Sequence, residues 1–252
     1  MRLIQPKQTQ GRKEAGNTII EFGLVMVFLV PMFAGAFTIG LALAKGIQVS
    51  NVARDAVVLA VRSTEDPQSG LDLSTTQNQR IIVKAANGLG MASDASFDPS
   101  ATGNAAVILS RVVMVGPTEC SLGVVPAPAG VPATTPWSAG NCPNFGSYAF
   151  EYRIVIGNGT RWSSTFGSPP SADLQTAAQC GTPVPANCVG SITAKNIATN
   201  AAVKAPNFPT ATGMTLAPSV YALVSEMYAD VSFLNFFNIL SNPTVIYARS
   251  IS

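Results

Sequence analysis

The stretch KEAGNTIIEFGLVMVFLV, Lys13 to Val30, joins a polar leader to a long apolar segment. From Phe22 to Ala44 no residue is charged. As a helix rising about 1.5 Å per residue, this segment crosses the ~30 Å hydrocarbon core of a bilayer. Basic residues dominate the leader, and Lys45 closes the apolar segment. The positive-inside rule therefore predicts a cytoplasmic leader, a membrane helix and an exported remainder after Lys45.

The helical pattern continues beyond the apolar segment. In IQVSNVARDAVVLAVRS, Ile47 to Ser63, apolar side chains recur at the spacing of one helix face. They are Val49, Val52, Ala53, Ala56, Val57, Ala60 and Val61. We expect one helix from about Thr18 to Arg62, apolar all round in its first half and amphipathic in its second. The amphipathic half is predicted to pack as core against a sheet.

A shorter helix is predicted after the turn TEDPQSG. Asp72 or Ser74 can cap it, and Gly88 can end it. Its apolar side is predicted to consist of Ile81, Ile82 and Ala85.

The rest of the sequence indicates strands separated by long loops. β-Branched or alternating stretches predict four strands, at Ala105–Val115, Ser147–Ile156, Ser219–Phe233 and Pro243–Ile251. Between them, residues 116–146 and 157–218 are rich in Pro, Gly, Ala and Ser, and we interpret both as loops.

Alternation assigns side chains to the two faces of the strands. One face of the second strand is predicted to present Tyr148, Phe150, Tyr152, Ile154 and Ile156. We expect the charged strand residues to be solvated and to form no acid–base pair; they are Glu151, Arg153, Glu226 and Asp230.

Composition excludes several classes of chemistry. The chain of 252 residues has no histidine, which rules out Ser-His-Asp and Cys-His catalysis and His-ligated metals. A net charge of +2 does not favour nucleic acid as a partner. We therefore expect no enzymatic activity, no cofactor and no metal site.

Four cysteines lie in the two predicted loops, and none forms a CxxC pair. An even count in exported loops indicates two disulfides, whereas a cytosolic protein would hold four free thiols. Proximity favours Cys120 with Cys142 and Cys180 with Cys188, but three connectivities are possible.

Two processing sites are compatible with the N-terminal sequence. An ordinary signal peptidase could cut after LALA, at Ala44, but this would sever the predicted helix. Cleavage after Gly16 would instead create an amine at Asn17, one helical turn before Glu21. An acidic residue near a membrane is usually functional. The carboxylate of Glu21 can neutralise this amine, or that of a neighbouring subunit, and so set the register of docking.

Four features resemble a known family: GNTIIEFGLVMVFLVP (Gly16–Pro31), NVARDAVVLAV (Asn51–Val61), the second short helix, and SVYALVSEMYADV (Ser219–Val231) together with the terminal VIYARSI. Gly16 followed by Glu21 as the fifth residue resembles the class III type IV prepilin cleavage site. The combined pattern is similar to the TadE-like minor pilins, or pseudopilins, of the tight-adherence (Flp-type) pilus system. The two long loops are not part of the resemblance.

The resemblance implies a type IV pilin-like α+β fold, with a long N-terminal helix on an antiparallel sheet of about four strands. It implies a leader at 1–16 that a prepilin peptidase removes, a transmembrane helix at 17–45 and an exported domain at 46–252. Gly16 and Asn17 would form the cleavage site, and Glu21 with Phe22 would set assembly.

The implied function is structural: initiation, capping or adhesion in a surface pilus. The implied partners are the prepilin peptidase, other pilins, the assembly platform and the membrane. The protein would cross the bacterial inner membrane once, with its exported domain in the periplasm or on the pilus. The alternative is a membrane-anchored or secreted binding domain unrelated to pili.

Overall fold

The computed structural model describes residues 11–65, 73, 75–92, 95–124, 136–170, 187–230 and 245–252. Packing divides the chain into two units, Met1–Ala44 and Lys45–Ser252. The long helix α1, Gly11–Glu65, belongs to both units. It begins earlier than the sequence predicted, so Gly16 and Asn17 lie within it.

The first unit consists of the N-terminal part of α1. From Ile19 onward almost every side chain there is exposed. Pro31 lies inside the helix, which continues on both sides of it. The all-round apolar surface predicted for this half is therefore present.

In the second unit, the remainder of α1 has one buried face. Six of the seven residues that the helical spacing selected are at most 3% exposed: Val49, Val52, Ala53, Ala56, Val57 and Ala60. All of them except Val57 share a core with Val107, Leu109 and Met227 of the sheet. The predicted packing of this amphipathic half on a sheet is confirmed.

Helix α2, Thr76–Ala85, lies in the same core layer. Its N-cap is Thr75, whose side chain accepts a hydrogen bond from the backbone N–H of Asn78. The predicted caps, Asp72 and Ser74, lie outside the described residues. The helix buries Gln79, Ile82 and Val83. Of the apolar side that we predicted, Ile82 is therefore buried, whereas Ile81 is 43% exposed and Ala85 is exposed as well.

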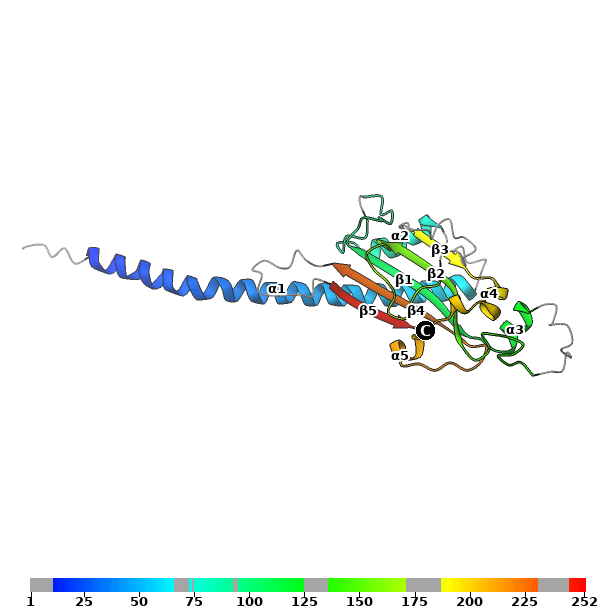
Figure 1. Ribbon diagram of the computed structural model, residues 1–252. Helices are drawn as coiled ribbons and strands as arrows, with labels where there is room; N and C mark the ends of the chain where they lie inside the picture. Colours follow the sequence, from blue (N-terminus) through cyan, green and yellow to red (C-terminus); the bar gives the residue numbers. More distant parts are fainter. Residues whose placement is uncertain are drawn as a thin grey trace, which may run out of the picture. The chain divides into compact units, whose positions relative to one another are not determined.

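The sheet has five antiparallel strands in the order β3-β2-β1-β4-β5. Four correspond to predicted strands: β1 (Ala105–Met114), β2 (Tyr148–Gly157), β4 (Tyr221–Asp230) and β5 (Val245–Ile251). The fifth, β3 (Asn187–Ser191), lies in a segment that we had interpreted as loop. The predicted α+β class is thus confirmed, with one strand more. Figure 1 shows β1, β2 and β4 side by side along the second half of α1.

A β-bulge in β2 corrects the predicted faces of this strand. Arg111 of β1 pairs with Tyr152, but the next residue, Val112, pairs with Phe150. Glu151 is therefore the extra residue, and the side-chain alternation shifts there. Tyr152, Ile154 and Ile156 face the core that contains α1, whereas Tyr148 and Phe150 pack in the core on the other face.

The face of the sheet away from α1 is covered by segments that we had interpreted as loops. They contain the short helices α3 (Pro117–Gly123), α4 (Ala194–Thr199), η3 (Ala201–Val203) and α5 (Phe208–Thr212). Residues such as Phe166, Ile197 and Phe208 pack on this face. The sheet is therefore buried on both sides.

Candidate membrane anchor and assembly segment

The candidate functional site is the exposed apolar half of α1. Its large side chains are strongly exposed, among them Ile19 at 72%, Phe22 at 61% and Met32 at 76%. Within the described residues, one helix is long and apolar enough to cross a membrane. Such a surface is stable only in lipid or against other apolar surfaces, because exposure of this area to water is unfavourable. The segment can anchor the protein in a membrane.

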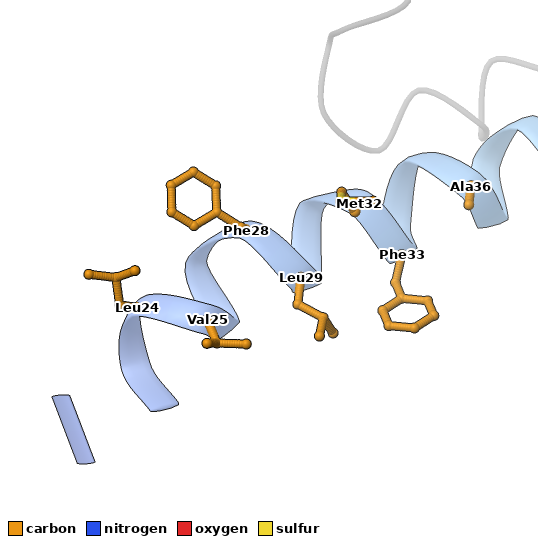
Figure 2. Close-up of a pocket in the computed structure, with 7 residues that line it drawn as sticks. All are labelled: Leu24, Val25, Phe28, Leu29, Met32, Phe33 and Ala36. Carbon is orange, nitrogen blue, oxygen red and sulfur yellow. The ribbon is translucent and has the colours of Figure 1, made fainter. Parts of the chain in front are cut away.

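Two rows of side chains shape one side of this segment, as Figure 2 shows. Leu24, Phe28 and Met32 follow each other four residues apart, and a second row runs beside them. The second row is Val25, Leu29 and Phe33. Rows at this spacing form the ridges and grooves by which helices interlock. The segment can therefore receive a neighbouring helix as well as lipid tails.

Among the described residues, nothing packs closely against the glycines Gly23, Gly35 and Gly40 of this segment. A Cβ atom added at Gly23, Gly35 or Gly40 would meet nothing within 4 Å. Glycine costs a helix about 1 kcal/mol relative to alanine. In membranes, small residues permit close approach of a second helix. The run Ala36, Gly40, Ala44 is equally compatible with the background composition of an apolar segment.

Glu21 is the acidic residue at the start of the exposed apolar surface. It is exposed and stands between Ile20 and Phe22, which are 68% and 61% exposed. The predicted cleavage residues Gly16 and Asn17 lie in the preceding turns of α1. The four predicted processing and assembly residues are therefore carried by one helix, in the order that the resemblance requires.

The predicted cysteine pairs differ in what the structure describes. Cys120 of α3 and Cys142 form a disulfide, and both residues are fully buried. Asn144, two residues further on, donates to the carbonyl oxygens of Ile197 and Asn200, both at 2.8 Å. This region is thereby tied to the α4 segment. Cys180 lies outside the described residues, and Cys188 is part of β3.

A buried polar cluster on the sheet corrects the expectation that its charged residues are solvated. Glu226 is 0% and Arg153 6% exposed. The Glu226 Oε1 atom accepts hydrogen bonds from the Thr165 hydroxyl at 2.6 Å, the Thr165 N–H at 3.1 Å and the Tyr247 hydroxyl at 3.0 Å. The Arg153 guanidinium donates to the Gly167 carbonyl at 3.0 Å.

Two further charged residues on the strands have partners as well. Asp230 is 9% exposed and pairs with Arg161. Glu151, at the bulge, pairs with Arg111 at 2.7 Å. Segment 158–170 covers β4 here, since the Trp162 ring stacks on Tyr228 with centroids 5.6 Å apart.

Burial changes the pKa values in this cluster. Loss of hydration lowers the pKa of Arg153 to about 10, and the negative charge of Glu226 acts in the opposite direction. Burial also raises the pKa of Tyr228, and Glu226 raises it further. The cluster thus holds neutral tyrosines around a carboxylate and a cation, an arrangement that fixes the covering segment to the sheet. In the part of the chain that is described, no group of three His, Cys, Asp or Glu side chains is placed to hold a metal ion.

In the part of the chain that is described, one long apolar helix near the N-terminus continues into an α+β domain, and this helix can anchor the chain in a membrane. Comparison with known families agrees with this class: residues 16–57 match the family described as TadE-like protein. The resemblance found in the sequence is confirmed over this segment, which the match associates with the Tad pilus system. No curated protein and no solved structure matches the chain.

Proposed function

We propose that this protein is a minor pilin or pseudopilin, a structural subunit of a Tad-type pilus rather than an enzyme. The observation that supports this most is the extent of the TadE-like match. It begins at Gly16, includes the exposed half of α1, and ends within the half that packs on the sheet. The match therefore includes every residue that the proposed processing and assembly require.

The first step of the proposed function is removal of the leader by a prepilin peptidase. The basic leader stays in the cytoplasm, and cleavage after Gly16 releases residues 1–16. The new amine at Asn17 then precedes Glu21 by four residues, or about 6 Å along a helix axis. The domain after Lys45 is exported.

The second step is transfer of the α1 anchor from lipid into a bundle of pilin helices. Both environments are apolar, so the exposed side chains from Ile19 onward stay out of water in each. The Glu21 carboxylate is costly to bury alone and is neutralised by an Asn17 amine in the correct register. It therefore selects the docked position rather than strengthening binding in general.

The third element is the exported domain, which the subunit presents on the assembled structure. Both faces of its sheet are covered, and the Cys120–Cys142 disulfide constrains the segments around α3. These features suit a domain that is displayed outside the cytoplasm. Initiation, capping and adhesion are all compatible with such a display.

The experiment is deletion of the gene in its native host, followed by counting of surface pili. Re-expression of the wild-type chain should restore pili, and Glu21→Ala should restore membrane insertion without pili. The matched control is Ile20→Ala, which leaves the carboxylate in place. If the deletion strain keeps a normal number of pili and normal adhesion, the proposed function is wrong.

A further inference from the structure

Within the described residues one edge of the sheet is unpaired, and its backbone groups define the kind of partner that it can take. The strand order places β5 at an edge, with β4 as its neighbour. At this end of the sheet, Leu223 and Ser252 exchange both backbone hydrogen bonds, at 2.8 and 2.9 Å. Antiparallel pairs alternate between hydrogen-bonded and non-hydrogen-bonded residues.

This alternation determines which backbone groups of β5 face away from β4. Ser250, Ala248 and Ile246 share the orientation of Ser252 and bond to β4. The residues between them point their N–H and C=O groups outward; they are Val245, Tyr247, Arg249 and Ile251. Among the described residues, none makes a hydrogen bond to these outward groups.

The edge has few of the features that normally prevent strands from pairing there. Natural edge strands are blunted by proline, by charged side chains such as lysine, by bulges or by very short length; in β5, Arg249 is the one charged residue. Strand β5 has seven residues, VIYARSI, with no proline, lysine or glycine, and its pairing with β4 has no bulge. The opposite edge, β3, has only five residues and contains Gly190.

The edge is also held in place before any partner arrives. Tyr247 packs on Tyr228 of β4 with ring centroids 4.9 Å apart, and its hydroxyl donates to the buried Glu226. All the residues of β5 remain at least partly accessible, with Tyr247 40% exposed. A strand fixed in this way loses little conformational freedom when another strand pairs with it.

We propose that the outer edge of β5 pairs with an extended segment of a second, different pilin-like subunit, which adds a sixth strand to the sheet. Only a backbone in extended conformation satisfies donors and acceptors that alternate in this way. Because this subunit is identified through the proposed function, the inference rests on that function.

The geometry also argues against pairing between two β5 strands. An antiparallel pair would run the packed halves of the two α1 helices in opposite directions, whereas the helices of one pilus bundle run in parallel. A parallel pair would place the two α1 helices on opposite faces of the joint sheet. Neither arrangement gives a bundle of parallel helices, so the added strand is not β5 of a second copy, and we assign it to a different subunit.

The test uses the full chain in its native host, with a photoreactive benzoylphenylalanine in place of Ser250. Ser250 would face the added strand across a non-hydrogen-bonded pair, the closer of the two kinds. We compare Arg249→Pro with Arg249→Ala in this background. Proline removes one outward N–H and no bond to β4, whereas alanine keeps the N–H and controls for loss of the side chain.

We expect a crosslink to a second pilin-like subunit that falls at least tenfold in Arg249→Pro and persists in Arg249→Ala. No crosslink, or equal crosslinking in both variants, would overturn the inference, and so would a crosslink between two copies of this chain. A proline-sensitive crosslink to a protein that is not a pilus component would contradict both the choice of partner and the proposed function. The number of pili on the deletion strain tests the proposed function separately. Should Arg249→Pro fail to fold, the pair Val245→Pro and Val245→Ala applies the same test at the first residue of β5.

Discussion

The packing of α1 on the sheet can be tested at Ala56, where the helix has no space for a larger side chain. Ala56 is 0% exposed and lies in the core that also contains Val107 and Leu109 of β1. Ala56→Leu would force three additional carbon atoms into this contact. Overpacking of a well-packed core costs about 1–3 kcal/mol.

This cost is measurable as a lower melting temperature. For a domain of roughly 150–250 residues, 1 kcal/mol corresponds to about 2–4 °C. Ala56→Leu should therefore lower the melting temperature by about 2–12 °C. The assay is thermal unfolding of the detergent-solubilised chain followed by circular dichroism.

The control lies on the same helix, two residues away. Val58 is 44% exposed, so Val58→Leu adds volume without meeting the sheet. It should leave the melting temperature within about 2 °C, since surface substitutions usually change stability by less than 0.5 kcal/mol. If both variants melt alike, α1 does not pack on the sheet through this face.

Four further predictions concern processing, assembly, thiols and the buried polar cluster. Gly16→Val should leave full-length protein in the membrane, because a peptidase pocket suited to glycine excludes the larger side chain; an immunoblot showing normal processing would refute the cleavage site. Glu21→Ala should be inserted and cleaved but should not co-purify with pilus components, and co-purification equal to wild type would argue against the register role. Unreduced, denatured protein from the exported fraction should take up no thiol label, whereas labelling of all four cysteines would contradict two disulfides and export. Glu226→Gln should reduce the free energy of unfolding by about 1–3 kcal/mol, as expected for lost interactions of a buried charge; in urea titrations, a loss in the Arg153→Met background equal to that in wild type would show that the two residues are not coupled.

The helix and four strands could be predicted because their patterns are long. The spacing from Val49 to Ala60 fits one helix face, and this face is the buried one. Strands β1, β2, β4 and β5 are seven to ten residues long and have extended apolar or alternating patterns.

The missed elements are short or polar. Strand β3, NCVGS, has no alternation, and its conformation depends on pairing with β2. Helices α3, α4 and α5 have five to seven residues, too few to be stable without tertiary contacts. Their sequences alone did not distinguish them from loops.

The buried charges could not be predicted from the strands alone. Antiparallel sheets often have one solvated face, and we assigned Glu226 and Arg153 to such a face. The structure covers this face with segment 158–170, in which Trp162 and Phe166 pack on the sheet. The aromatic residues within a Gly- and Ser-rich segment were the available signal, since a free loop has little reason to contain them.

The candidate cleavage site could be predicted from the sequence, because it rests on local features. These are the spacing from Gly16 to Glu21 and the uncharged segment that follows. The match over residues 16–57 supports the same segment. The edge proposed to bind a partner could not be predicted from the sequence, because the orientation of the backbone groups of β5 depends on strand order and register. These are properties of the folded sheet and not of VIYARSI as a sequence.

The claim that this protein is a processed pilin-like subunit is tested most directly by its N-terminal sequence and its intact mass, both measured on protein purified from its native host. We expect the mature chain to begin Asn17-Thr18-Ile19 and to lack the mass of residues 1–16. A chain that begins at Met1, or directly after Ala44, would contradict the claim that this protein is a processed pilin-like subunit.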